Sequence, residues 1–204
     1  MNLKDNIDFV GHFAIKVFKK DGSIEEYQDK NLIMDRARQN MAQLVGGVTN
    51  GSDRTKGEPI NKFVLGTEGH VGDNILDYKK VGSNGFDSTR TNLFSQADNL
   101  EFYTLTFDPT GGSTKTNINA TGVNSKISGN ETGCTVTRTV SAQTCTYVIT
   151  IPDVNANAAS SDTSIIAYTE AALYAGDDIF SMKTFPARVK EDTVKFEITW
   201  SIIF

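Results

Sequence analysis

The sequence predicts a mainly β fold, either a β-sandwich or a small barrel of about eight strands, with one short helix packed on it. Three observations lead to this prediction. Apolar and polar residues alternate in several short runs, turn residues separate those runs, and only one segment has the apolar spacing of a helix. Strands and helices do not alternate along the chain, which argues against a parallel α/β sheet. We expect residues 1–204 to form a single domain that contains a long polar insert at about residues 110–133.

The clearest strand is the last stretch of the chain, residues 193–204, which holds the only tryptophan. Neighbouring strand side chains point to opposite faces of a sheet, so an apolar residue at every second position predicts one buried face. The residues between them are polar except Ile203. We therefore predict that this strand is central to the core. Its expected core residues are Phe196, Ile198, Trp200, Ile202 and Phe204.

Residues 9–28 have the pattern of a β-hairpin. Phe13, Ile15 and Val17 alternate with other residues, and Asp21-Gly22 supplies a turn that matches the twist of paired strands. The returning strand has charged residues interleaved, as an exposed or edge strand would. His12 is better interpreted as a polar strand residue than as a ligand or a base.

A helix is predicted from Ile33 to Val45, with Asn31 as its N-cap and Gly46-Gly47 at its end. Ile33, Ala37, Met41 and Leu44 form one apolar stripe, at spacings that place them on the same helix face. We expect Met41 and Leu44 to pack against the sheet as core residues and not to form part of a cofactor site.

The middle of the chain is less regular. Short strands are predicted at residues 60–65 and 100–108, and residues 70–99 are expected to be mostly loop. The glycines of residues 66–69 indicate a turn, since no Lys-Ser or Lys-Thr pair follows to form a phosphate-binding loop. The insert at 110–133 is too polar to bury much surface, so it is either a mobile loop or a polar β-hairpin at the surface.

The later part of the chain is predicted to form a series of strands. Residues 134–140 and 145–151 form a candidate hairpin, and residues 164–174 and 179–185 flank a turn, with a loop through Pro186 before the last strand. The first of these hairpins would allow Cys134 and Cys145 to face each other, but two reduced, packed thiols are the favoured interpretation in a reducing compartment.

The charge and hydropathy of the chain argue against several classes of protein. A net charge of −5 gives no basic surface for nucleic acid. No run approaches the roughly 18–20 apolar residues needed to cross a bilayer, and the first residues lack the apolar run of a signal peptide. We therefore expect synthesis in a cytoplasm, with neither nucleic acid nor membrane as a partner.

No motif of a known catalytic site is found, and we expect no enzyme activity, no cofactor and no metal site. A zinc site would need more ligands than His12 and His70 can offer with two cysteines. Glu170 is the most notable acid because it interrupts the apolar run 165–173. It is either a buried acid with a shifted pKa or the partner of Arg188 or another base, and a structural pair is the favoured interpretation.

Two groups of segments carry a family resemblance. The first group joins Asn31-Leu32-Ile33 and the short helix to residues 63–69, Phe-Val-Leu-Gly-Thr-Glu-Gly, and to residues 86–89. The second joins residues 168–174, Tyr-Thr-Glu-Ala-Ala-Leu-Tyr, and residues 179–185 to the final Thr-Trp-Ser-Ile-Ile-Phe. This layout resembles structural proteins of tailed bacteriophage virions. It departs from their pattern at Glu68, which separates the glycines, and in the polar insert.

The resemblance implies a non-enzymatic virion protein, present in multiple copies in the neck or tail region or on the capsid. Its partners would be other virion structural proteins and copies of itself, and it would reach the virion after synthesis in the host cytoplasm. One alternative is a host-receptor or glycan-binding module carried on a virion fibre. A second alternative is an enzyme, such as a hydrolase domain on a virion, in which Glu170 would be the residue to test.

Overall fold

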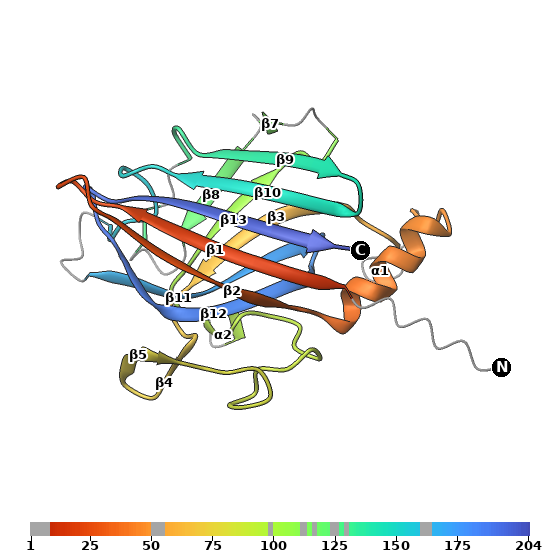
Figure 1. The fold of residues 1–204 in the computed structure, drawn as a ribbon, viewed down its shortest axis with the longest axis horizontal. Coiled ribbons are helices and arrows are strands. Elements are labelled where there is room, and N and C mark those ends of the chain that lie inside the picture. Colours follow the sequence, from red (N-terminus) through yellow and green to blue (C-terminus); the bar gives the residue numbers. More distant parts are fainter. Residues whose placement is uncertain are drawn as a thin grey trace.

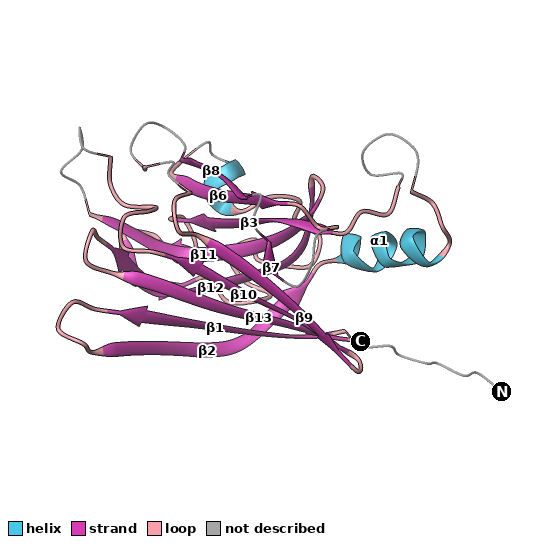
Figure 2. Cartoon of the chain, turned by 90° about the horizontal axis from the view of Figure 1, so that it is seen from above, coloured by secondary structure: helices cyan, strands magenta, loops and turns pink. Residues whose placement is uncertain are grey.

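The computed structural model describes residues 9–49, 56–97, 100–110, 114–115, 118–122, 127–128, 131–159 and 165–204. In this part of the chain an 11-stranded sheet has the order β7-β9-β10-β13-β1-β2-β12-β11-β3-β6-β8. The sheet turns back on itself at β2 and β12, so that its two halves face each other across the core (Figures 1 and 2). The mainly β prediction is confirmed, and short strands in the segments expected to be loops raise the number of strands above eight.

The bounds of the elements follow the chain in order. They are β1 Val10–Phe18, β2 Ile24–Ile33, α1 Asp35–Val45, β3 Ile60–Gly66, β4 His70–Val71, β5 Asn74–Tyr78, α2 Phe94–Ala97, β6 Phe102–Phe107, β7 Thr114–Lys115, β8 Ile118–Gly122, β9 Thr135–Ser141, β10 Thr144–Ile151, β11 Ile166–Ala175, β12 Asp178–Lys190 and β13 Lys195–Ile203.

The C-terminal strand β13 lies in the middle of the first half of the sheet, between β10 and β1. Phe196, Ile198, Trp200 and Ile202 are fully buried, as their alternation predicts. The Trp200 ring packs edge-on against Phe13 at a centroid distance of 5.0 Å, and its Nε1–H donates to Ser181 Oγ at 3.2 Å. The indole therefore joins the two halves of the sheet, because Ser181 belongs to β12.

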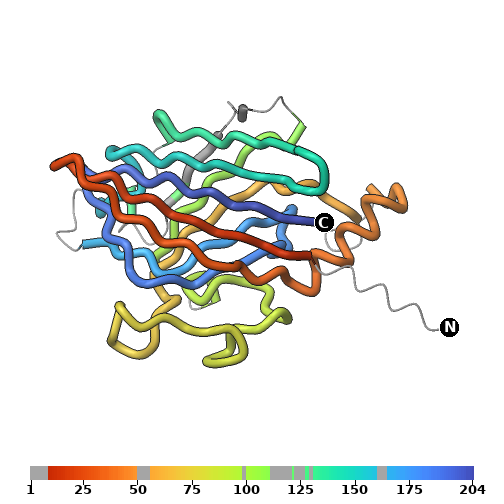
Figure 3. The backbone as a smooth tube through the Cα atoms, viewed as in Figure 1, coloured from red at the N-terminus to blue at the C-terminus, as the bar shows by residue number. Residues whose placement is uncertain are grey.

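Phe204 is a correction to the predicted core, since 36% of it is exposed. The strand ends at Ile203, whose partner Val10 begins β1, so Phe204 lies beyond the last pair of the sheet. Its backbone N–H donates to Gln143 O, and its ring packs edge-on against Phe9 at 5.4 Å. The end of the chain is near α1 (Figure 3).

The helix starts later than its sequence pattern predicts. Ile33 is still in β2, because this strand continues far enough to pair with Ser181 of β12. Asn31 is therefore a strand residue whose Nδ2 donates to His12 O, and the prediction of an Asn31 N-cap is wrong.

The helical stripe is only partly buried. Ala37 is buried, while Met41 and Leu44 are half-buried at one end of the core. The helix extends past the end of the sheet (Figure 1), so these two side chains cover the edge of the core and are not enclosed by it.

Strand β12 continues through Pro186, where a loop was expected. Its register with β11 shifts at this point: Arg188 lies opposite Tyr168, but Thr184 lies opposite Glu170. Such irregularities tolerate proline, which has no N–H to donate to a neighbouring strand. The Arg188 guanidinium donates from Nη1 to the carbonyl oxygens of Pro186 and Ala187, at 3.3 and 3.0 Å.

The polar insert contributes the outermost strand at each edge of the sheet, β7 at one edge and β8 at the other. β7 pairs with β9 and β8 pairs with β6, so these two strands do not form a hairpin with each other. Only residues 116–117 separate Lys115 from Ile118, so the insert crosses from one outer edge of the folded sheet to the other. The rest of the insert lies largely outside the described residues.

The hairpin of β9 and β10 is confirmed, and both cysteines are free. Cys145 lies opposite Val140, whereas Cys134 precedes β9 and is buried. The two thiols therefore do not face each other across the hairpin.

Candidate functional site

Glu170 is fully buried in the middle of β11, and its contacts join this strand to α2. Its Oε1 accepts from the backbone N–H and the Oγ–H of Ser95, both at 2.7 Å, and its Oε2 accepts from the backbone N–H of Phe94 at 2.9 Å. Burial raises the pKa of the Glu170 carboxyl, and these three donors act in the opposite direction. The favoured interpretation, a structural pair with Arg188 or another base, is therefore wrong, and Glu170 is the alternative, a buried acid with a shifted pKa, held by donors at the start of α2.

The glycine-containing turn at residues 66–69 is fixed by Ser95, the same residue that donates to Glu170, and by Thr169. Ser95 Oγ accepts from the backbone N–H groups of Thr67 and Glu68, at 2.7 and 3.1 Å. Thr169 accepts from Gly69 N–H at 2.8 Å and donates to Thr67 O at 2.6 Å. Both oxygens of the Glu170 carboxylate are thus occupied by the protein's own groups, which is the arrangement of a structural acid.

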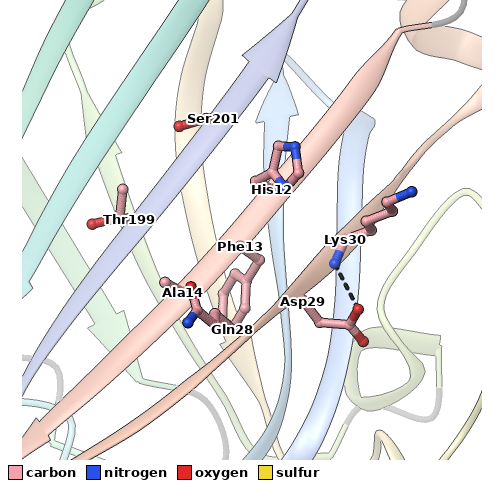
Figure 4. Close-up of a pocket in the computed structure, with 8 residues that line it drawn as sticks. All are labelled: His12, Phe13, Ala14, Gln28, Asp29, Lys30, Thr199 and Ser201. Atoms are coloured by element: carbon pink, nitrogen blue, oxygen red, sulfur yellow. Dashed lines mark hydrogen bonds between the residues drawn. The ribbon is translucent and has the colours of Figure 1, made fainter.

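An open hollow of about 430 Å³ lies on the outer face of the sheet, over β13, β1 and β2 (Figure 4). Two rows of the register line it. His12 lies between Ser201 and Lys30 in one row, and Ala14 lies between Thr199 and Gln28 in the next. The Phe13 ring is buried on the opposite face of β1, in contact with Trp200.

The hollow offers hydrogen-bonding groups and positive charge to a ligand. Ala14 has a short side chain, which leaves the floor low between its polar neighbours. The lining presents two hydroxyls, a carboxamide, an imidazole, an ammonium group and one carboxylate, that of Asp29, which is already paired. The Asp29 carboxylate accepts from the Lys30 backbone N–H at 2.8 Å and from Lys183 Nζ at 2.6 Å. This set suits a hydroxyl-rich or anionic molecule held by hydrogen bonds.

A smaller apolar groove, here called the α1 groove, lies between α1 and the adjacent ends of β10 and β13. Its volume is about 140 Å³, and its lining is mostly apolar. The apolar residues that matter here are Met41, Leu44, Ile60, Tyr147, Ile202 and Phe204.

Lys190 is a buried cation at the end of β12. Its Nζ donates to Asn157 Oδ1 at 2.9 Å and to the carbonyl oxygen of Asp153 at 3.2 Å. Burial lowers the pKa of Lys190 to about 8. These acceptors belong to the segment before β11, so Lys190 holds that segment to the end of β12.

The described residues do not bring three or more His, Cys, Asp or Glu side chains together in a way that would hold a metal ion. His12 lies in the outer hollow, whereas His70 Nδ1 contacts Thr67 O at 2.8 Å in the turn that Ser95 and Thr169 fix. None of the described helices has the length and apolar character needed to cross a membrane.

Comparisons of the chain with protein-family models, with curated proteins and with solved structures gave no match. The residues of this chain are therefore the basis for a proposal about its function.

The sequence indicated Glu170 but neither the outer hollow nor the α1 groove. Both depend on the register between strands that are far apart in the sequence, such as β1 and β13. The alternation of apolar residues did show that His12, Ala14 and Lys16 share the outer face of β1, which was the one available signal for the hollow.

Proposed function

We propose that this chain is a non-enzymatic structural protein of a tailed-bacteriophage virion, present in multiple copies in the neck or tail region or on the capsid. The observation that carries the proposal is the contact between two segments that resemble this class of protein. Gly66 of the glycine turn lies directly opposite Glu170 of the Glu-Ala-Ala-Leu segment, and Ser95 of α2 bonds to both segments, donating to the Glu170 carboxylate and accepting from the Thr67 N–H.

We would expect these two segments to occur together in proteins of this class, because each packs closely against the other. A side chain at Gly66 would place its Cβ 2.5 Å from Glu170 Oε1 and 2.6 Å from Ser95 Oγ. The third segment of the resemblance, β13, holds the indole that joins the halves of the sheet. All three contribute contacts to one folded sheet, which suits a protein whose role is to hold neighbouring subunits.

The test is to determine whether the protein belongs to the particle. Quantitative mass spectrometry of purified virions of the phage that encodes it should find several copies per particle. Cross-linking of intact virions should join it to neck, tail or capsid proteins. Its absence from purified virions, when it is abundant in the infected cell, would refute the proposal.

A second candidate function, binding of a glycan or host receptor, is favoured by the outer hollow. Its groups suit the hydroxyls and carboxylates of sugars, although its lining places no exposed aromatic ring for stacking. A glycan array with the wild-type protein and the Ala14→Gln variant tests it. Binding that is lost when the floor of the hollow is filled would support this function, and no binding by the wild type would exclude it for the glycans on the array.

A further inference from the structure

We propose that copies of this chain associate head to tail, with Leu76 of one copy seated in the α1 groove of the next. The inference rests on the proposed multi-copy assembly and names the surfaces that make the contact. The partner is a second copy of this chain. Four observations support this arrangement: an unfilled groove, an exposed apolar side chain on a fixed hairpin, opposite charges around the two, and their positions in the molecule.

The α1 groove leaves apolar surface open at one end of the molecule. Met41 and Leu44 are half-buried, and Phe204 is 36% exposed. Val45, one turn after Met41, is 85% exposed. Apolar residues that gather in this way around a depression mark a contact surface more often than the same residues scattered singly.

Leu76 is the apolar side chain that suits this groove. It is 71% exposed on β5, and it lies between Asn74 and Tyr78 on the short β4–β5 hairpin. The hairpin is fixed to the body of the protein at its base. Lys79 N–H donates to Gly69 O at 2.8 Å, and the Tyr27 hydroxyl donates to the Tyr78 hydroxyl at 3.2 Å. The hairpin therefore presents Leu76 without needing to be ordered on binding.

The groove and the hairpin match in size and in charge. A cavity of about 150 Å³ with an apolar lining holds one benzene-sized group, and the groove, at about 140 Å³, suits one leucine side chain. Asp73 and Asp77 flank Leu76 and are exposed. The one carboxylate in the groove lining, Glu58, is paired with Lys56 at 2.7 Å. Arg38 is exposed on α1, one turn before Met41, so its cation is the charge beside the groove that can meet the hairpin carboxylates.

The two surfaces lie far apart in one copy, which makes the contact intermolecular. The hairpin lies below the sheet on the left of Figure 1, whereas α1 lies at the right-hand end of the molecule. A contact between two different surfaces is heterologous and repeats from copy to copy, and it forms a ring when the rotation closes. A ring or a repeating array is the kind of assembly that the proposed position in a virion requires.

Complementary variants test the contact. Leu76→Asp removes the inserted side chain, and Leu44→Glu places a charge in the groove. Val140→Asp is the matched control, because Val140 is equally apolar and 67% exposed, but on β9. The measurement is the mass distribution of the purified full chain by sedimentation velocity, with circular dichroism to verify folding.

We expect the wild type and Val140→Asp to form the same oligomer. Leu76→Asp and Leu44→Glu alone should each weaken association by about tenfold or more. An equimolar mixture of these two variants should form a 1:1 dimer and nothing larger, because only one intact hairpin and one intact groove can meet in it.

Two results would overturn the inference: a wild-type protein that stays monomeric at the highest concentrations measured, or an oligomer that Leu76→Asp leaves unchanged. If Leu44→Glu fails to fold, Arg38→Glu replaces it, and its association should be restored by Asp73→Lys with Asp77→Lys on the same chain. Failure of that restoration would also count against the contact. The virion assignment is judged separately, by the presence of the chain in purified particles.

Discussion

The most informative single residue is Glu170, a buried acid that has hydrogen-bond donors around it in place of a base. Two backbone N–H groups and a hydroxyl solvate the carboxylate where water cannot reach it. A short helix that begins at Phe94 supplies two of these donors, as the first turn of a helix has N–H groups without partners inside the helix. This arrangement explains how an acid can interrupt an apolar strand without a salt bridge.

Glu170→Gln should destabilise the protein by about 1–3 kcal/mol while leaving the fold intact. The amide oxygen can still accept from Ser95, but the amide NH₂ group would then face the Phe94 N–H, which loses its acceptor. Urea denaturation followed by tryptophan fluorescence measures the change, with Glu26→Gln on an exposed strand position as the control. An unchanged stability would show that Glu170 is not a structural acid and would reopen the enzyme alternative.

Lys190 gives a prediction of pH dependence because its burial lowers the pKa to about 8, from a usual value of 10.5. Only 1% of this residue is exposed. Between these two pH values the unfolded chain binds a proton that the folded chain has released, so the free energy of unfolding should rise with pH. The gain over this window should be roughly 2–3 kcal/mol, since one pKa unit corresponds to about 1.4 kcal/mol.

The difference in unfolding free energy between wild type and Lys190→Met isolates this effect from the tyrosines and cysteines that titrate nearby. Denaturant titrations at pH values from 7 to 10 should show the wild type gaining stability relative to the variant. A difference that stays constant over this range would mean that Lys190 keeps its ordinary pKa.

Among the elements, the turn after β3 depends most on close approach. A Cβ on Gly69 would lie 2.4 Å from the backbone oxygen of Thr169 and 2.8 Å from Glu170 Cβ. The first of these atoms belongs to the backbone of β11, which cannot move aside without breaking its pairing with β3 and β12.

Gly69→Ala should therefore cost about 2–3 kcal/mol, in the range of overpacked sites. Gly46→Ala is the comparison, because Gly46 has an ordinary right-handed conformation and its Cβ would lie 3.2 Å from the nearest atom. Thermal melts of the two variants measure the difference. Equal melting temperatures for both would show that the turn yields, and that packing does not require glycine at position 69.

The strands were predictable from the sequence where one face of the strand is buried, as in β1 and β13. The predictions failed where a distant partner decides the outcome. Ile33 continues a strand because β12 is beside it, and Pro186 is accommodated by a register shift between β11 and β12. Phe204 is exposed because β1 begins at Val10, opposite Ile203, and has no strand residue opposite Phe204. The partners of Glu170 were missed for the same reason, since the segment around Phe94 has no periodic pattern that indicates a helix.

At the scale of the whole molecule, the two halves of the sheet are joined directly by a short seam. β2 pairs with β12 only at Ile33 with Ser181 and Leu32 with Met182. Beyond these pairs side chains span the seam: Lys183 Nζ meets the Asp29 carboxylate at 2.6 Å, and the Tyr27 hydroxyl reaches Tyr78 of the β4–β5 hairpin. The Lys183 side chain is nearly buried, whereas the Asp29 side chain is about half exposed.

Replacing one partner of the ion pair at this seam should therefore destabilise the protein more than replacing both partners. Asp29→Asn leaves a nearly buried ammonium group without its carboxylate and should cost about 1–3 kcal/mol, less than a fully buried pair because water reaches Asp29. The double variant Asp29→Asn with Lys183→Met should recover part of this loss, because no unpaired charge remains. A double-mutant cycle from urea denaturation gives the coupling free energy between the two residues.

Hydrogen exchange locates the effect within the molecule. In Asp29→Asn the amides of β2 and of the β4–β5 hairpin should exchange faster. The amides of β10 and β13, in the middle of the first half of the sheet, should still exchange only through global unfolding of the protein. Additive costs in the cycle, or equal acceleration of exchange in every strand, would show that the seam does not open separately and that the folded sheet behaves as one cooperative unit.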